Sequence, residues 1–376
     1  MRSATSYTGL AALTTLVAWL SCTSCALAPG SATDPPLGLL FGLGPEAHAA
    51  QSSPLNQQAP LGMYTTWYNG PSDLSWMSNW REAFVPSVYA SGKALHIIVA
   101  ASGGPETGVP CGRQYPISAG IDIDMVQLAH IFAGTATDPP LYVTLFTEFQ
   151  TYPCVDNQWK GAEDYYAALQ AKMLRIKDIF HQYAPNSKVS IGWGGWQSRW
   201  DDPTNGGGRS LFPYFANVMS QMDFQSFQAM QDDGNVNDVR GMSKALGAYG
   251  PVMLAHYKPN SGSTTTYSAD LTAMMTDDFL REVTGYGLFA WSFMDTAQMS
   301  SDPSIFTLVK DALLRYGHLP ATPVGGEAEP PPSTPDVLAS KGGGSTLNAR
   351  SLVGFAAGGS ILLAVGWYAG RHWRSG

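Results

Sequence analysis

Residues 141–149 read LYVTLFTEF, a continuous apolar run with a single acidic residue near its end. A segment with helical periodicity follows at Gly161–Tyr183, and a second apolar run occupies Val189–Trp196. In the helical segment, apolar residues recur at intervals of three and four: Leu169, Met173, Ile176 and Phe180. Strands that are covered on both faces read as continuous apolar runs. The three segments therefore predict a strand-helix-strand unit with parallel strands.

The same alternation continues in both directions along residues 34–320. Eight apolar runs are strand candidates: Leu37–Leu43, Leu61–Trp67, Leu95–Ala101, Leu141–Phe149, Val189–Trp196, Met222–Ala229, Pro251–His256 and Gly287–Phe293. Further helices are expected at Asp122–Ala133, Ala269–Val283 and Ser304–Tyr316. Eight such units predict an α/β protein of the (β/α)8 or TIM-barrel class.

The first strand candidate, Leu37–Leu43, has a second interpretation. It could belong to a long leader that ends at the Ala-His-Ala sequence of residues 47–49, which would leave seven strands. We favour eight, because a barrel of seven strands would be unusual and small residues at Ala26–Ala28 already offer a cleavage site.

Residues 1–33 have the layout of a secretory signal or leader segment. Arg2 precedes an apolar run at Leu10–Leu20, and the small residues Ala26–Ala28 follow it. We therefore expect the barrel to be exported.

The last part of the chain predicts a membrane anchor. Residues 321–350 form a linker rich in Pro, Gly and Ser, residues 351–370 are apolar, and the short tail 371–376 is basic. An uncharged run of this length is just sufficient to cross a bilayer as a helix. A buried core helix is the alternative, but the linker before it and the basic tail after it favour a single C-terminal transmembrane helix with the tail in the cytoplasm. The expected location of the barrel is the cell surface, outside the cytoplasm.

Composition excludes several classes of function. The chain has a net charge of −8, a pI near 5.3 and no cluster of basic residues, so it is not expected to bind nucleic acid. No histidine pair has the spacing of metal ligands, since His130 and His181 each stand alone in a helical segment. We therefore expect no metal and no cofactor.

Two cysteines remain outside the leader, Cys111 after the third strand candidate and Cys154 after the fourth. In an exported protein a lone pair more often forms a disulfide than a metal site or a reactive thiol. A Cys111–Cys154 bond is predicted, which would fix the loop that follows residue 148.

Glu148 is the strongest candidate for a catalytic residue. Active groups of such barrels lie where strands end and the following loops begin. An acidic residue that closes an otherwise apolar strand is desolvated and can keep its proton near neutral pH, as a general acid requires. The alternative is a glutamate that only anchors a neighbouring loop.

The stretch Pro140–Phe149, the helix with Tyr165 and Tyr166 and the run Val189–Trp196 together resemble the central strands of barrel glycoside hydrolases similar to family 26 mannanases. The resemblance implies that Glu148 is the acid/base glutamate and that a second glutamate, the nucleophile, closes strand seven. The sequence departs from the family there, because strand seven reads PVMLAHYKP and has His256 at that place.

The second catalytic group is consequently open. An inverting mechanism would use another carboxylate as the base on a water, and the candidates are Asp232 and Asp295, then Asp201, Asp202 and Asp233. His256 or Tyr257 could instead take part directly, or the site could bind sugar without cleaving it. His256 could also line the pocket and form hydrogen bonds without acting as a base.

Aromatic residues indicate the substrate, because sugar rings present flat C–H faces that stack on indole and phenol rings. The predicted substrate-binding residues are Tyr64, Trp67, Trp193, Trp196, Trp200, Gln228, Tyr257 and Trp291. A thick aromatic core is the alternative for part of this set.

The sequence thus predicts an exported, membrane-anchored glycoside hydrolase that cleaves an extracellular or cell-wall polysaccharide, with Glu148 as general acid. One alternative is a carbohydrate-binding barrel without activity, a pseudoenzyme or adhesin. A second is a polysaccharide lyase with His256 or Tyr257 as base, in which Lys258 and Arg199 would neutralise a substrate carboxylate.

Overall fold

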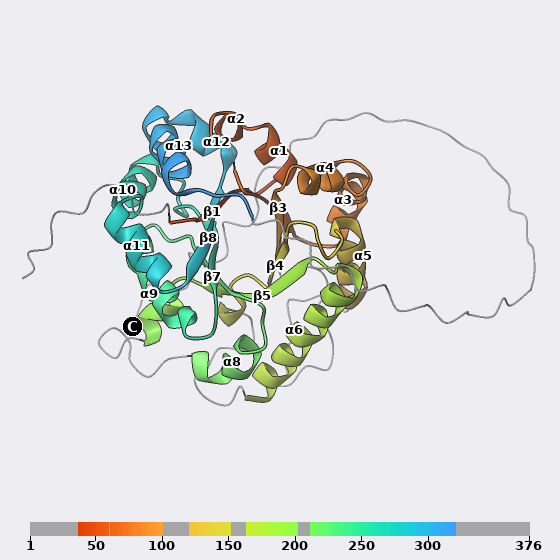
Figure 1. Cartoon of the computed structure of the whole chain (residues 1–376). Coiled ribbons are helices and arrows are strands. Elements are labelled where there is room, and N and C mark those ends of the chain that lie inside the picture. Colours follow the sequence, from red (N-terminus) through yellow and green to blue (C-terminus); the bar gives the residue numbers. More distant parts are fainter. Residues whose placement is uncertain (1–36, 60, 101–119, 152–162, 202–210, 321–376) are drawn as a thin grey trace, which may run out of the picture. The chain divides into compact units, whose positions relative to one another are not determined.

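The computed structural model describes residues 37–59, 61–100, 120–151, 163–201 and 211–320. Eight parallel strands close into a barrel in chain order, with helices around it (Figure 1). The strands are β1 Leu40–Gly44, β2 Met63–Tyr68, β3 Ala94–Val99, β4 Leu141–Leu145, β5 Ser187–Gly194, β6 Gln225–Ala229, β7 Val252–Tyr257 and β8 Leu288–Met294. Each overlaps one of the eight predicted runs, so the predicted (β/α)8 barrel is confirmed.

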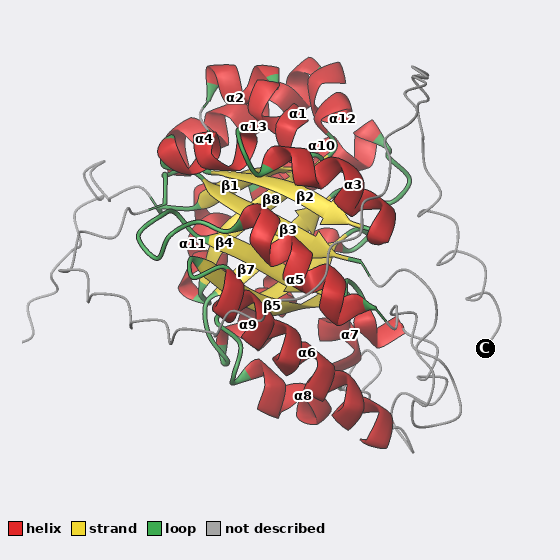
Figure 2. Ribbon diagram, turned by 90° about the vertical axis from the view of Figure 1, so that its right-hand side faces the viewer, coloured by secondary structure: helices red, strands yellow, loops and turns green. Residues whose placement is uncertain are grey.

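Helices cover the outside of the barrel (Figure 2). The α-helices are α1 Ala47–Ser52, α2 Pro54–Gln58, α3 Leu74–Met77, α4 Phe84–Ala90, α5 Ile121–Phe132, α6 Glu163–Tyr183, α7 Gln197–Asp201, α8 Phe212–Met219, α9 Asn235–Gly247, α10 Thr264–Met274, α11 Asp277–Gly285, α12 Thr296–Ser301 and α13 Pro303–Tyr316. Short 3-10 turns are η1 Pro71–Asp73, η2 Ser78–Trp80 and η4 Phe149–Thr151.

The first strand belongs to the barrel and not to a leader. β1 pairs in parallel with β2 on one side and with β8 on the other. Just before it, Leu39 donates its N–H to the carbonyl of Tyr316 at 2.8 Å and accepts from the N–H of His318 at 3.0 Å. These bonds join the end of α13 to the start of β1, so the eight-strand interpretation of the sequence is correct.

Side chains inside the barrel, below the strand ends, are apolar or uncharged. The apolar members pack together as Leu40, Met63, Ala94, Ile98, Phe224, Met253, Ala255 and Ala290. The side chains on the other face of each strand contact the helices and build the larger core. In α6 this contact uses Leu169, Met173, Ile176 and Phe180, all fully buried, as the helical spacing predicts.

A chain of hydrogen bonds crosses the barrel interior below the carboxyl ends of the strands. Ser292 contacts Thr65 at 2.7 Å, Thr65 contacts His96 Nδ1 at 3.3 Å, and His96 Nε2 contacts Thr144 at 2.9 Å. Thr144 donates to Ser226 at 3.1 Å, and Ser226 donates in turn to the carbonyl of residue 191 at 2.9 Å.

The final carbonyl can only accept, so every proton in this chain points the same way. His96 must then donate from Nε2 and accept at Nδ1, which makes it neutral. Burial accordingly lowers the pKa of His96 to about 3. The barrel interior therefore contains an uncharged layer of polar side chains, each of which makes a hydrogen bond.

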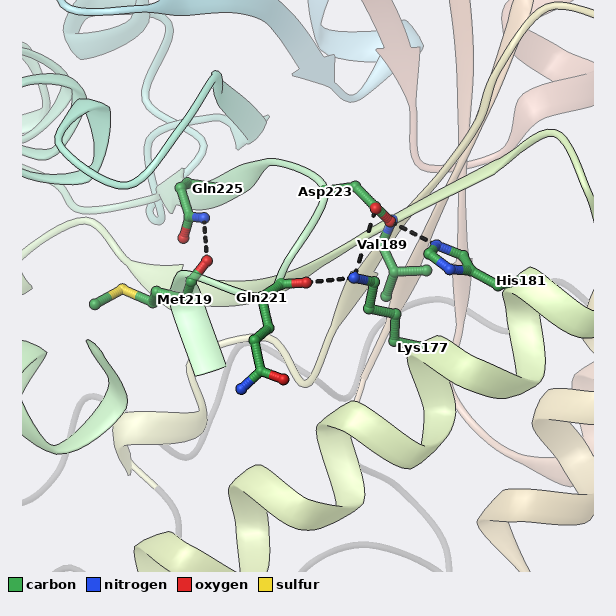
Figure 3. Close-up of polar contacts among 7 residues, drawn as sticks. All are labelled: Lys177, His181, Val189, Met219, Gln221, Asp223 and Gln225. Carbon is green, nitrogen blue, oxygen red and sulfur yellow. Dashed lines mark hydrogen bonds and ion pairs between the residues drawn. The ribbon is translucent and has the colours of Figure 1, made fainter. Parts of the chain in front are cut away.

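A second polar cluster fastens α6 to the amino-terminal part of the sheet (Figure 3). The Asp223 carboxylate accepts from the backbone N–H of Val189 at 2.7 Å and contacts His181 Nε2 at 2.8 Å. Lys177 lies 3.6 Å from the same carboxylate and also donates to the carbonyl of Gln221. Regular pairing between β5 and β6 starts only at Gly192. At Val189, before that point, the Asp223 side chain provides the hydrogen-bond acceptor that a neighbouring strand would otherwise supply.

Two predicted elements differ from the observed ones. The segment Ala269–Val283 forms two helices, because Met275 leaves the helical conformation and Thr276 caps α11 by accepting from the N–H of Phe279. The run Leu141–Phe149 is strand only to Leu145, since Phe146 has a φ of 57°, which no extended strand allows. The short helices before β3 and the helices α7, α8, α9 and α12 were not predicted.

Several predictions lie outside the described residues. They are the leader 1–33, Cys111, Cys154, the linker 321–350, the transmembrane helix 351–370 and the basic tail 371–376. No helix within the described ranges is both long enough and apolar enough to cross a membrane.

Candidate active site

The turn after β4 presents Glu148 at the carboxyl ends of the strands. Phe146 and Glu148 both have left-handed backbone conformations, with φ of 57° and 55°. Non-glycine residues adopt this region at a cost that the surrounding structure must offset, and such residues cluster at functional sites. The offset comes from both neighbouring strands: Phe146 donates its N–H to the carbonyl of Val99 at 2.9 Å, and Glu148 to that of Gly192 at 2.9 Å.

Gln150 fixes this turn from the other side. Its amide donates to the carbonyl of Gly194 at 3.1 Å and accepts from the Gly194 N–H at 3.0 Å, so one side chain imitates a pair of ladder hydrogen bonds. A Cβ at Gly194 would lie 2.6 Å from the Gln150 amide nitrogen, which only glycine avoids. Gln150 was not predicted as a functional residue, because a single glutamine two residues after an acid does not reveal its burial.

The Glu148 carboxyl group is half-buried and faces the barrel interior. It accepts a hydrogen bond from the side-chain amide of Gln228, which extends from the end of β6 across the intervening β5. Burial raises the pKa of Glu148 to about 7, and the bond from Gln228 lowers it in part. The group can therefore hold and release a proton near neutral pH, as the sequence predicts for a general acid.

His256 lies beside Gln228 in the register of β6 and β7, and it also faces the interior. Its Nδ1 accepts from the indole N–H of Trp67 at 2.9 Å, although β8 and β1 stand between β7 and β2. The two rings meet edge to face with centroids 5.0 Å apart. An indole N–H can only donate, so the neutral His256 carries its proton on Nε2.

This environment makes His256 a hydrogen-bond donor and a poor base. Burial, followed by the neighbouring His96 and Lys258, lowers its pKa to about 3, against the opposite effect of Asp295. The Nε2 atom is fully buried and has no partner among the described residues. A buried N–H without a partner is energetically costly. Direct participation of His256 as a base is therefore disfavoured.

Asp295 is the carboxylate next to this group. It follows β8 with a φ of 74°, which makes it the third non-glycine residue in the left-handed region among those described. Its N–H donates to the carbonyl of Gly44 at 2.8 Å. Its side chain contacts Lys258 Nζ at 2.8 Å, and both side chains are partly covered. Because Asp295 influences the pKa of His256, its charge lies within reach of the proposed site.

Asp232, the other principal candidate for the second carboxylate, does not face the interior. Its side chain is exposed, and it accepts from the backbone N–H of Ser261 in the loop after β7. Asp233 is exposed as well, whereas the side chain of Asp201 and all of Asp202 lie outside the described set. Asp295 is thus better placed than Asp232 or Asp233.

Four of the predicted sugar-stacking residues lie between the strands and the helices. Tyr64, Trp193, Tyr257 and Trp291 are at most 2% exposed and belong to the outer core. Trp193, for example, packs on Phe212 of α8 with ring centroids 4.9 Å apart. The period of two along a strand turns these side chains away from the barrel axis, so the structure corrects their assignment to substrate binding.

Trp67 and Trp196 are different, because both are partly exposed at the carboxyl ends of β2 and β5. Trp67 contacts His256, and the Trp196 ring lies against the backbone of Gly194. The side chain of Trp200 lies outside the described set. Trp67 and Trp196 therefore remain the aromatic candidates for substrate contact, together with Gln228.

Two further acids that were not predicted from the sequence stabilise the surroundings of the site. Asp238 of α9 is buried and paired with Arg199 of α7 at 2.8 Å; burial raises its pKa to about 6, although Arg199 lowers it. Asp270 of α10 accepts from the Tyr257 hydroxyl at 3.1 Å. Both acids sit in segments of mixed polarity, so the sequence pattern does not distinguish them from exposed ones.

The described residues contain no group of three or more His, Cys, Asp or Glu side chains arranged to hold a metal ion. The side chains that the structure brings together at the strand ends are carboxyl groups, an amide, an imidazole, an ammonium group and aromatic rings.

The sequence matches no protein-family model and no curated protein. Similar folds occur among solved structures. One is a family 26 β-mannanase from Bacteroides ovatus, 11% identical with a TM-score of 0.48, covering 74% of this chain and 88% of that one. Another is a mutant xylanase from Cellvibrio japonicus, 12% identical with a TM-score of 0.43, covering 75% and 98%. A β-1,4-mannanase from the sea hare Aplysia kurodai is 10% identical with a TM-score of 0.35, covering 68% and 91%.

These TM-scores lie below 0.5 and the identities are low. The barrel is established by its own strand pairing, and a fold of this kind hosts many unrelated reactions. The function therefore has to be argued from the side chains at the strand ends.

Proposed function

We propose that this chain is an exported, membrane-anchored glycoside hydrolase that cleaves an extracellular or cell-wall polysaccharide, with Glu148 as its general acid. The observation that carries the proposal is the Glu148 carboxyl group at the carboxyl end of β4, turned inward and with its pKa raised to about 7 by burial. A glycosidic oxygen leaves as an alkoxide unless it is protonated, so a carboxylic acid that remains protonated near neutral pH is the principal requirement.

In the proposed reaction, the Glu148 O–H transfers its proton to the departing sugar oxygen while the C–O bond breaks. The amide of Gln228 then stabilises the carboxylate that forms, because it already donates to Glu148 Oε1. The imidazole of His256 faces the same interior, where the indole N–H of Trp67 orients it.

The second carboxylate of the reaction is proposed to be Asp295. Strand seven carries His256 instead of a carboxylate, so a covalent glycosyl intermediate at that strand is disfavoured. Asp295 follows the next strand, and its carboxylate forms an ion pair with Lys258 at 2.8 Å. An ionised carboxylate at this place can take a proton from an attacking water, which leads to inversion at the anomeric carbon.

The test is hydrolysis by the full-length chain in detergent, with a panel of mannan, xylan, β-glucan and chitin and detection of new reducing ends. We expect cleavage of at least one polymer and a loss of at least about 100-fold in Glu148→Gln, because the amide cannot donate the proton. NMR of the first product should show the inverted anomer. A retained anomer would refute the role of Asp295 while leaving Glu148 as the acid.

The matched control is Asp278→Asn, which removes an exposed carboxylate from α11 and should leave the rate unchanged. Full activity of Glu148→Gln would overturn the proposal.

The absence of a carboxylate on strand seven also favours a second candidate, a carbohydrate-binding barrel without activity. Its signature is tight binding of a polymer by the wild type with no new reducing ends.

The geometry does not favour a lyase. A lyase needs a base that removes the proton next to a uronate carboxylate, but the pKa of His256 is about 3 and burial raises that of Tyr257. The Tyr257 hydroxyl also points to Asp270, outside the barrel. Lys258 and Arg199, which would neutralise the substrate carboxylate, are each paired with an acid already.

Export and anchoring are proposed from the sequence alone, through the leader 1–33 and the apolar segment 351–370. Protease treatment of intact cells should remove the barrel and leave a tag fused after residue 376 protected. The Cys111–Cys154 disulfide is part of the same proposal, since an exported pair would be oxidised. Peptide mass spectrometry without reductant should recover the two cysteines as one linked pair.

A further inference from the structure

A groove of about 720 Å³ lies on the outside of the barrel, lined from α1, α3, η2 and α4. Figure 1 shows these helices next to one another on one side of the molecule. Its volume is in the range of sites that bind small ligands or a short stretch of a polymer. None of the residues discussed so far as catalytic lines it, so it is a separate feature of the surface.

Two indole rings form the apolar part of this groove. Trp76 and Trp80 meet at 72° with centroids 4.9 Å apart, and Trp80 rests on Phe84 at 4.9 Å. Trp80 is thus held by the core, whereas Trp76 is 38% exposed. A tryptophan that keeps so much surface in water while its neighbour fixes its position is suited to stacking on a ligand ring.

The polar part of the groove does not favour anionic ligands. Among the described residues that line it there is no lysine or arginine, so an anionic ligand such as a uronate would find no such cation. Its one carboxylate, Glu46, caps α1 by accepting from the N–H groups of His48 at 2.9 Å and Ala49 at 2.6 Å. The amides of Gln51 and Asn79 can donate and accept. This combination fits hydroxyl groups around a flat apolar face, as in a neutral sugar.

The backbone links one lining residue of the groove to the proposed active site. Glu46 directly follows Pro45, and the carbonyl of Pro45 accepts from the backbone N–H of Trp67 at 3.2 Å. Trp67 in turn contacts His256 of the proposed active site. Glu46, which lines the groove, is therefore linked to that site through Pro45 and Trp67.

We propose that this groove is an accessory binding site for a neutral polysaccharide, in which Trp76 stacks on a sugar ring remote from the bond that is cleaved. The choice of ligand deepens the proposed function and rests on it, but binding in the groove does not require Glu148. The site would raise the affinity for long chains and leave the chemical step unchanged.

The experiment compares the full-length wild type, Trp76→Ala, Trp76→Phe and a matched control, Leu314→Ala, which removes an exposed apolar side chain from α13. Affinity electrophoresis with mannan, xylan and β-glucan measures binding, and hydrolysis is measured on a long polymer and on an oligosaccharide of two or three sugars. Thermal unfolding checks that each variant is folded.

We expect Trp76→Ala to weaken binding of one neutral polymer about 10-fold and to raise KM for it by a similar factor, with kcat/KM on the short substrate unchanged. Trp76→Phe should recover most of the affinity, and Leu314→Ala should bind as the wild type does. Equal binding by Trp76→Ala and wild type, a wild type that binds no neutral polymer, or an equal loss on the short substrate would each overturn the proposal.

Repeating the binding measurement in Glu148→Gln separates the two proposals. Binding that depends on Trp76 in a chain without hydrolytic activity supports the groove even if the proposed function fails. Hydrolysis that depends on Glu148, with binding indifferent to Trp76, supports the proposed function and refutes the groove.

Discussion

The replacement Glu148→Gln should abolish activity and at the same time stabilise the protein at alkaline pH. In the folded chain, burial raises the pKa of Glu148 from 4.5 to about 7. A glutamate with a raised pKa favours its protonated form in the folded state, so its contribution to stability is complete below pH 4.5. That contribution is lost as the pH rises through the interval from 4.5 to about 7, where the buried carboxyl must ionise.

The magnitude follows from the shift. At about 1.4 kcal/mol per pH unit, ionising Glu148 inside the folded protein costs about 3 kcal/mol once the pH exceeds 7. The carboxyl is only half-buried, so solvent screening makes this an upper value. The amide introduced by Glu148→Gln cannot ionise, so the variant is free of this penalty. The free energy of unfolding of the variant minus that of the wild type should therefore increase by about 2 to 3 kcal/mol between pH 4 and pH 8.

The assay is urea denaturation of both proteins at pH 4, 6 and 8, combined with hydrolysis across the same range. Taking the difference between variant and wild type cancels the titration of the other acids. In the wild type, kcat/KM should fall about 10-fold per unit above pH 7, because the protonated fraction of Glu148 falls by that factor. A stability difference that does not change with pH would refute the burial argument, even if the variant were inactive.

The remaining predictions concern three other side chains. Gln228→Met removes the donor that lowers the pKa of Glu148, so the alkaline limb of the kcat/KM profile should move to higher pH; an unmoved limb would show that this bond has no role. Trp193→Ala should lower the free energy of unfolding by about 3 to 5 kcal/mol in urea titrations, because its ring is fully buried against α8, and a loss below about 1 kcal/mol would contradict its place in the core. Asp223→Ala leaves the Val189 N–H without its acceptor and should cost about 2 kcal/mol, measured as a lower urea midpoint with unchanged KM; wild-type stability would exclude the fastening role in Figure 3.

The order of the secondary structure was accessible from the sequence because it follows from local patterns. A strand of a parallel barrel is covered on both faces and therefore reads as an apolar run, and the helix Glu163–Tyr183 shows its buried face in the spacing of its apolar residues. The boundaries were less accessible. The left-handed Phe146 ends β4 early, and no residue type in LYVTLFTEF indicates that conformation.

Glu148 was also accessible, since an acid at the end of an apolar strand is an unusual local pattern. Its partner Gln228 entered the candidate set too, but the bond between them depends on β4 and β6 being two places apart around a closed ring. The tautomer of His256 depends likewise on Trp67, which is 189 residues away in the chain.

The sequence by itself determined the eight parallel strands, their order and the acid at the end of the fourth, because each depends on residues within a short window. Only the tertiary structure decided which side of each strand faces the barrel axis, and so separated Trp67 from Trp193 and Asp295 from Asp232. A continuous apolar run has no alternation of polar and apolar residues, so its sequence does not show which side chains face the barrel axis. The closure of the barrel, with the bulges between β6, β7 and β8, determines which side chains face inward.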